Sequence, residues 1–495
     1  MKKNLILAGL AVLAFAACDK NEGPDGGKTP EPKDPEIKAV WACKLSDGGK
    51  MDGLHPAIDA NGNVYATESN TTKLYKIAPN GTIAWAKAMV PTSESADPFS
   101  GQLSAPSVEA DGSVVYAGGG SSSNGAYYAL NAADGSYKWE FSSDKFWAVS
   151  GDPAPKINRV NAAIGKECIY IGNGGTTGTA LAINKETGAR VSYVSSKEDG
   201  TGGPAGGCNV GVSLTKGGMA LFRAGYGAFS ANTAAMDKPG DKAYVTYTAQ
   251  YRDKGMTQNN GNIACFTKDG KDYYAFCGAT SAGMNIIWGP VATEGSLVAY
   301  NSDTNPNWTT HSIAGTKAQD QGGLVIGLKG EIIVTLKHKD EANPGGVYAV
   351  DPTTNEMAWR YNVGLDLAGT PAVDKAGNVH VIDDYGKYYM LKPNYEEKTA
   401  ELLQSAELSE IYAELNDITW DTETNKERCK AYGTVIIGKD GRMYTSAYFR
   451  QDGVSGKPSI CSVVFCLESG LCEGAGDTPW PLKNGDCFNS GNQQK

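Results

Sequence analysis

A hairpin motif that recurs along the chain constrains the fold more than any other feature. Residues 129–139 read as a strand, a tight turn at Asp134-Gly135 and a second strand that carries Trp139. The spacing returns at 182–192, with Ser192 in place of the tryptophan, and at 349–359, which ends in Trp359. A copy with a turn one residue shorter, 78–85, ends in Trp85. Self-similarity with a period of about 50 residues predicts a solenoid or a propeller.

A second recurring unit lies upstream of these hairpins. Residues 55–65, 105–116 and 370–380 each read as a short strand, a glycine-containing turn and another strand. Asn-Gly and Asp-Gly turns between apolar runs are typical of β-hairpins. Joined to the later hairpin, each period becomes a four-stranded antiparallel meander, which is the blade of a β-propeller.

The two units together resemble the tryptophan-docking repeat of the quinoprotein-like (PQQ-like repeat) β-propeller superfamily, over roughly residues 37–480. The resemblance implies an all-β fold, a single β-propeller of four-stranded antiparallel blades. It also implies structural docking roles for four tryptophans, namely Trp41, Trp85, Trp139 and Trp359. The superfamily includes pyrroloquinoline-quinone dehydrogenases and also non-enzymatic lipoproteins of outer-membrane assembly, so the resemblance alone does not fix a function.

Eight stretches qualify as the first strand of a blade, beginning near Leu54, Ser104, Val160, Cys208, Asn262, Gly322, Gly369 and Tyr432. They predict eight blades; seven is the alternative, because residues 286–300 either complete the fifth blade or form a unit of their own. The last blade lacks a fourth strand with a tryptophan. Residues 37–43, which include Trp41, are the expected replacement, and such a strand would close the ring and remove its open edges.

The chain begins with features of a lipoprotein. Residues 1–17 are a predicted signal peptide, since Lys2 and Lys3 precede an apolar run too short to span a bilayer. Small residues followed by Cys18 resemble the lipobox of bacterial lipoproteins, which implies a lipid anchor on that cysteine. Residues 18–36 are polar and proline-containing and are predicted to be a disordered tether. Residues 37–495 are the expected propeller, with a C-terminal cover segment around Trp480.

The residues after Cys18 bear on location. Acidic and lysine residues there resemble the surface-export signals of Bacteroidetes-type lipoproteins, which implies the outer membrane or its outer face. In enteric bacteria, Asp19 would instead imply retention at the inner membrane. We expect a lipid-anchored protein of the cell envelope, at the outer membrane.

Charge and cysteine content exclude some functions. A net charge of −10 disfavours binding to nucleic acid. The cell envelope permits disulfides, and three groupings are candidates, with buried free thiols as the alternative. They are Cys43 with Cys461 or Cys466, Cys265 with Cys277, and Cys472 with Cys487. No metal site is predicted, because there is no C-x-x-C motif and the four histidines are far apart in sequence.

The same residues argue against quinone chemistry. Resemblance to the quinone enzymes implies two adjacent, bonded cysteines, a Ca²⁺ ion and an aspartate base. This chain has no adjacent cysteine pair and no c-type haem motif. We therefore predict no cofactor, no catalytic residues and no enzymatic activity. A carboxylate pair for glycoside cleavage has no sequence signature, so a polysaccharide-acting enzyme with its site at the channel mouth stays open as an alternative.

Four tryptophans fall outside the docking motif, namely Trp147, Trp288, Trp308 and Trp420. Aromatic side chains on loops can stack on sugars or anchor a protein; the alternative is that they fill gaps between blades. The leading prediction is a non-enzymatic, lipid-anchored propeller of the cell envelope that binds a protein or a glycan. A scaffold subunit of outer-membrane assembly is a further alternative.

Overall fold

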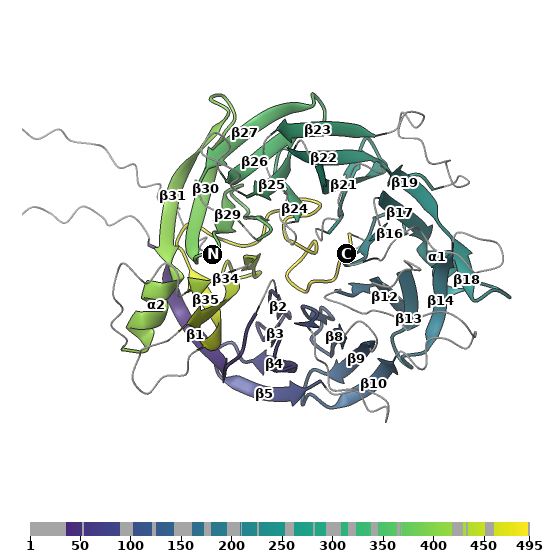
Figure 1. Ribbon diagram of the computed structural model, residues 1–495, viewed down its shortest axis with the longest axis horizontal. Helices are drawn as coiled ribbons and strands as arrows, with labels where there is room; N and C mark the ends of the chain where they lie inside the picture. Colours follow the sequence, from purple (N-terminus) through teal and green to yellow (C-terminus); the bar gives the residue numbers. More distant parts are fainter. Residues whose placement is uncertain are drawn as a thin grey trace, which may run out of the picture. The chain divides into compact units, whose positions relative to one another are not determined.

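A computed structural model of the chain describes most of residues 36–495. The described residues are 36–51, 54–89, 102–120, 125–142, 161–172, 180–195, 208, 210–224, 227–252, 262–280, 283–293, 308–314, 323–337, 345–363, 367, 369–417, 429–431, 434–450 and 460–493. Within this unit, antiparallel sheets lie side by side around a centre, as Figure 1 shows. The described strands form eight blades, which confirms the β-propeller and the predicted number.

The first four blades follow each other in chain order. The first blade contains β2 (Ala57–Ile58), β3 (Val64–Thr67), β4 (Lys73–Ile77) and β5 (Ile83–Ala88). In the second blade, β6 (Gln102–Leu103) and β7 (Ser107–Val108) both pair with β8 (Val114–Gly120), and β9 (Gly125–Asn131) and β10 (Tyr137–Ser142) follow. The third blade contains β11 (Ala163–Ile164), β12 (Cys168–Gly172), β13 (Ala180–Asn184) and β14 (Arg190–Ser195), and the fourth contains β15 (Ser213–Leu214), β16 (Met219–Ala224), β17 (Gly227–Asn232) and β19 (Thr248–Arg252).

The next three blades continue the pattern. Their strands are β20 (Ala264–Lys268), β21 (Lys271–Thr280), β22 (Gly283–Pro290) and β23 (Thr309–Ala314); β24 (Leu324–Ile326), β25 (Ile332–Leu336), β26 (Gly346–Asp351) and β27 (Glu356–Asn362); and β28 (Ala372–Val373), β29 (Val379–Ile382), β30 (Lys387–Asn394) and β31 (Thr399–Glu407). β22 is the third strand of the fifth blade, so the segment from residue 286 completes that blade.

The eighth blade is built from both ends of the described chain. β33 (Ile436–Ile437) and β32 (Cys429–Lys430) pair with β34 (Met443–Arg450), which pairs with β35 (Ile460–Glu468). β1 (Lys38–Asp47) then pairs with β35, with Trp41 opposite Cys466. The N-terminal strand therefore supplies the outer strand of the last blade, as predicted.

A buried carboxylate also joins the eighth blade to the first. Glu68 follows β3, and its carboxylate accepts a hydrogen bond from Ser46 Oγ of β1 at 2.7 Å and from Tyr75 Oη of β4 at 2.8 Å. Ser462 Oγ of β35 and Thr71 Oγ1 donate to the same carboxylate. The ring is thus closed by side-chain bonds as well as by strand pairing.

Three elements depart from the repeat. α1 (Thr233–Asp237) and β18 (Tyr244–Thr246) lie between the third and fourth strands of the fourth blade, and β18 pairs parallel with β14 of the third. α2 (Leu408–Leu415) follows β31, and the ring of Tyr412 stacks on Phe449 of β34 with centroids 4.5 Å apart.

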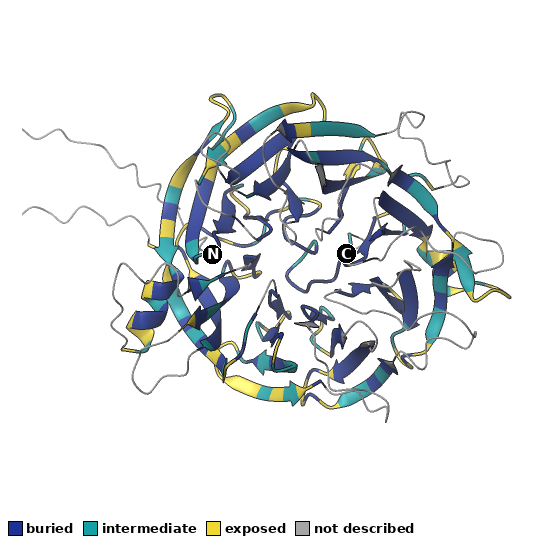
Figure 2. Ribbon diagram, in the orientation of Figure 1, coloured by how far each residue is buried: buried dark blue, intermediate teal, exposed yellow. Residues whose placement is uncertain are grey.

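Turn chemistry and packing explain why the repeat folds in this way. Gly135 and Asn355, in equivalent turns, have φ of 71° and 60°, a region that glycine and asparagine tolerate best. The core lies between neighbouring blades: Tyr116 and Trp139 of the second blade pack with Ile169 and Leu181 of the third. Figure 2 shows the result, with buried inner strands and partly exposed outer strands.

Candidate functional site

Three of the four predicted docking tryptophans bond to the next blade of the ring. Trp41 Nε1 donates to the carbonyl of Pro79 at 3.0 Å, Trp85 Nε1 to Ala132 at 3.1 Å, and Trp139 Nε1 to Lys185 at 2.8 Å. Each acceptor opens the turn between the third and fourth strands of the neighbouring blade. The indole then packs on a glycine of that turn whose backbone has a positive φ. A Cβ added to Gly81, Gly135 or Gly188 would lie 3.0 Å or less from the tryptophan side chain.

Polar side chains bond to the backbone of the next blade at two other junctions, and a bond between two side chains is made at a third. Ser192 Oγ donates to the carbonyl of Met236 at 2.7 Å, so the serine keeps the bond that the indole makes elsewhere. Gln250 exchanges two bonds with the backbone of Ala292, at 3.2 and 2.8 Å. Gln404 Oε1 accepts from Ser469 Oγ at 2.6 Å. Sequence reasoning missed both glutamines, because the repeat gives them no signal.

Trp288 lies in the gap between two blades, which is the alternative that the sequence left open for it. It lies on β22, is only 2% exposed, and its Nε1 donates to the carbonyl of Pro352 at 3.3 Å. The indole reaches the turn of the sixth blade from the third strand of the fifth, a position that the motif does not cover. Trp359 is fully buried between the sixth and seventh blades.

The remaining site predictions are only partly placed. Trp308 is half-buried, with its ring edge-on to Tyr251 at a centroid distance of 4.9 Å. Trp147, Trp420 and Cys18, the predicted site of a lipid anchor, lie outside the described residues.

The described cysteines follow the second alternative from the sequence, buried thiols, rather than the candidate disulfides. The ten cysteines of the described residues are all buried, and none of them forms a disulfide. β-Sheet register explains part of this outcome, since Cys265 lies opposite Tyr274, Cys277 opposite Ile286, and Cys466 opposite Trp41. Burial raises the pKa of the Cys43 thiol to about 11 and that of Cys466 to about 12. These thiols are therefore protonated and unreactive in the folded protein.

A cover segment, residues 469–493, runs across the innermost strands of the ring. It appears in yellow at the centre of Figure 1. Its carbonyls accept hydrogen bonds from the first strands of six blades, from Ile58 N to Cys487 O, Val108 N to Phe488 O, Ile164 N to Ser490 O, Leu214 N to Gly491 O, Ile326 N to Trp480 O and Val373 N to Pro481 O. The segment thus ties the blades together on the inner side.

Two basic side chains, Lys483 and His55, are buried where the cover segment meets the ring. Burial lowers the pKa of the Lys483 ammonium to about 8. Burial and the charge of Lys483 hold the pKa of His55 well below its usual range. Asn489 Nδ2 donates to the carbonyls of Pro56 and Pro106, at 3.1 and 2.9 Å, and so links the first two blades.

One cluster contains three residue types that bind metals. Asp374, His380 and Cys472 are all buried, and one ligand atom from each lies within 4.8 Å of the others. The first two come from the seventh blade and the third from the cover segment.

The residues of this chain do not fit a quinone cofactor: no two cysteines of the chain are adjacent, and the cover segment lies against the inner strands.

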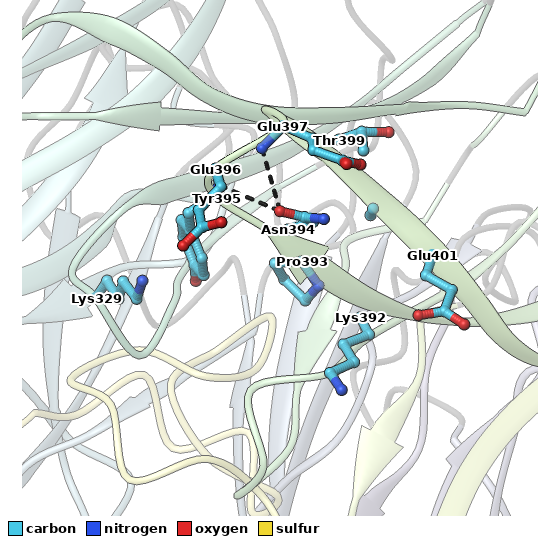
Figure 3. A pocket seen from close by; sticks show the side chains of 10 residues that line it. Lys329, Lys392, Pro393, Asn394, Tyr395, Glu396, Glu397, Thr399 and Glu401 are labelled. Atoms are coloured by element: carbon cyan, nitrogen blue, oxygen red, sulfur yellow. Dashed lines mark hydrogen bonds between the residues drawn. The ribbon is translucent and has the colours of Figure 1, made fainter.

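A groove lies at the outer rim, between the sixth and seventh blades. β27 and β31 meet there in parallel, with Arg360 N donating to Lys398 O at 3.2 Å. Two adjoining hollows of about 610 and 700 Å³ share Glu397, Thr399 and Ala400. The first is lined by Lys329 and residues 392–397 and 399–401 (Figure 3), and the second also by Met357 and residues 360–362.

The groove is ordered by its own side chains. Tyr395 Oη donates to Glu331 Oε1 at 2.7 Å, and Lys329 Nζ lies 3.6 Å from the centre of the tyrosine ring. Asn394 Oδ1 accepts from the backbone N–H groups of Glu396 and Glu397, both at 3.2 Å, as the dashed lines of Figure 3 mark. The two glutamate side chains are exposed. Charges of both signs therefore lie on a fixed turn.

Comparison with known proteins supports the fold. A family model described as outer membrane protein assembly factor BamB matches residues 34–269. BamB from Moraxella catarrhalis has 14% identity and a TM-score of 0.49, with 86% of this chain and 97% of that chain covered. A europium-containing methanol dehydrogenase has 10% identity and a TM-score of 0.52, with 87% and 93% covered.

No curated protein sequence matches the chain significantly. Within the described ranges, no helix is long and apolar enough to cross a bilayer. At 10% identity, the likeness to the dehydrogenase shows a shared fold and nothing about the reaction.

Proposed function

We propose that this chain, which belongs to the PQQ-like repeat β-propeller superfamily, is a non-enzymatic binding platform of the cell envelope. A lipid on Cys18 holds it to the outer membrane, residues 18–36 are the tether, and the propeller binds a partner, which we take to be a protein rather than a glycan. The observation that carries the proposal is the ordered, charged groove between the sixth and seventh blades.

The chemistry of the groove favours a protein partner. Lys329 covers one face of the Tyr395 ring, and the phenol is bonded to Glu331, so this tyrosine is not an open stacking surface for a sugar. Exposed lysine, arginine and glutamate side chains instead offer ion pairs to a polar protein surface, and such contacts mainly set association rate and specificity. A rigid ring keeps these groups in place without any chemistry.

A scaffold role in outer-membrane assembly is a second candidate. The match of residues 34–269 to the BamB model supports it, as does the lipoprotein-like N-terminus. In that case the partner would be a protein of the assembly machinery. Copurification of such a protein with the wild-type chain, together with reduced outer-membrane protein levels on gene deletion, would support this role.

The direct test is a charge reversal in the groove with a matched control. Glu396→Lys changes an exposed residue of the turn between β30 and β31. Ala133→Lys places the same side chain at the equivalent exposed position of the turn between β9 and β10. We expect the partner that copurifies with the full-length wild type to be lost with Glu396→Lys and retained with Ala133→Lys.

Two results would contradict the proposal. One is retention of the same partner by both variants to the same extent. The other is turnover of a polysaccharide or an alcohol by the purified full-length chain, since a binding platform leaves such substrates unchanged.

A further inference from the structure

We propose that Asp374, His380 and Cys472 form a Zn²⁺ site that clips the cover segment to the seventh blade. The three residues contribute a carboxylate oxygen, an imidazole nitrogen and a sulfur atom, all buried and all within 4.8 Å of one another. This mixed donor set is typical of zinc in proteins, and three protein ligands leave the fourth position of a tetrahedral ion to water. The site is independent of the proposed binding function.

The histidine is an exception to the repeat. In the first blade, Tyr65 Oη donates to Asp59 Oδ2 at 3.0 Å, and in the second, Tyr116 Oη donates to Glu109 Oε1 at 3.0 Å. His380 occupies the corresponding place in the seventh blade, with Nε2 3.1 Å from Asp374 Oδ2. A phenol satisfies the turn carboxylate without any metal. In the seventh blade, an imidazole thus stands in place of the phenol, and the cover segment brings a thiol to it.

The neighbours of His380 would orient it as a ligand. Its Nδ1 lies 2.5 Å from Tyr388 Oη, and Tyr388 Oη donates to Met443 Sδ at 2.9 Å. With the phenol proton directed at the sulfur, Nδ1 carries the imidazole proton and donates it to the phenol oxygen. The lone pair of Nε2 then faces the lone pairs of Asp374 at 3.1 Å, and a cation between them removes the repulsion. Such a bond to the second nitrogen is the usual support of a zinc-bound histidine.

The proton balance is simple. Zn²⁺ binds to Sγ of Cys472, the S–H bond breaks, and the proton leaves to solvent, so binding is favoured by rising pH. No electron is transferred in either direction.

The position of the site gives the metal a structural role. On the same turn, Lys375 N donates to Gly474 O at 3.0 Å, and Gly476 N donates to Val373 O at 2.8 Å. These backbone bonds bring the start of the cover segment to the seventh blade, and a metal would add a bond between side chains of the two. Since the metal binds the folded arrangement only, it would stabilise that arrangement.

Cobalt titration of the purified, chelator-treated full-length chain tests the proposal. We expect one equivalent of Co²⁺ to bind with a near-ultraviolet sulfur-to-cobalt absorption band, and Zn²⁺ to displace it. Cys472→Ser should abolish the band, and His380→Tyr, which introduces the residue found in the first two blades, should abolish stoichiometric binding. Cys487→Ser, a control in the same segment, should retain both. Tyr388→Phe should weaken binding by about 10- to 100-fold.

A second measurement keeps the test valid if Cys472→Ser fails to fold. Zn²⁺ should raise the melting temperature of the wild type and leave that of His380→Tyr unchanged. The proposal is overturned if the wild type binds no stoichiometric metal, or if folded His380→Tyr shows the same band and the same response to Zn²⁺.

Discussion

Ser192 donates from its hydroxyl to the carbonyl of Met236, in the place where Trp139 of the preceding blade donates from its indole to Lys185. The hydrogen bond between blades is kept at both junctions, while the buried aromatic surface differs. The two contributions can therefore be measured separately.

Substitutions at these two positions should differ in cost. Trp139→Ala removes a buried ring and its bond and should lower the free energy of unfolding by about 3–5 kcal/mol. Ser192→Ala leaves one buried carbonyl without its partner and should cost about 1–3 kcal/mol. Denaturant unfolding of both variants checks the order; equal costs would contradict a packing role for the indole.

Closure of the ring should depend on Glu68. Its carboxylate accepts from hydroxyl groups of the eighth and first blades, including Ser46 and Ser462. Glu68→Ala leaves these buried donors unsatisfied, so we expect a loss of at least about 3 kcal/mol. Glu401→Ala, at an exposed position, should stay within about 0.5 kcal/mol of the wild type. Comparable thermal melting of the two variants would refute this.

Stability should depend on pH through Lys483. Burial lowers the pKa of its ammonium from 10.5 to about 8, so between these values the unfolded chain binds more protons than the folded one. The free-energy cost of burying the ammonium is therefore absent above pH 10.5. It grows as the pH falls and is fully present below pH 8, so the protein loses stability over this range. Lys483→Met removes the cost of burying the charge and should be about 3 kcal/mol more stable than the wild type at pH 7.

The advantage of Lys483→Met should shrink between pH 8 and 10.5. Melting temperatures of both proteins across this range measure it, and other titrating groups cancel because the two chains share them. A constant difference at all pH values would show that the lysine does not titrate as expected.

The thiols should be protected in the native state. The ten cysteines of the described residues are buried, and burial raises the pKa of Cys208 and Cys277 to about 12. A thiol reagent at pH 8 should therefore react slowly with the folded chain and quickly with these ten after denaturation. Mass spectrometry of the unreduced protein gives an independent check: a deficit of two hydrogens would indicate a disulfide that the structure lacks.

Membrane attachment should depend on Cys18. Cys18→Ser should move the protein from the membrane fraction to the soluble fraction and remove the mass of the lipid. Cys43→Ser changes a buried cysteine of β1 and should leave fractionation as in the wild type. Continued membrane association of Cys18→Ser would argue against the lipid anchor.

Local patterns were enough to predict the blades, because turn glycines and alternating apolar residues are encoded within each repeat. The role of Trp41 was also predictable, since the last blade visibly lacked a strand. The docking contacts of Gln250 and Trp288 were not, because these residues depart from the motif and only the fold brings them to a neighbouring turn.

Clusters made by distant segments were the hardest to predict. His380 and Cys472 belong to different segments, and no spacing in the sequence links them; only the path of the cover segment brings them together. The groove is similar, since Lys329 and Tyr395 come from neighbouring blades and meet only when the ring is built.

Closure by the N-terminal strand has a consequence for biogenesis. Glu68 and Ser462 are 394 residues apart, so in the proposed export of the chain β1 would emerge long before its partner strand β35. An unpaired strand edge is a template for aggregation, and contacts of such long range form late in folding. We therefore expect a chaperone of the export route to shield the newly translocated N-terminal strand until the last blade arrives.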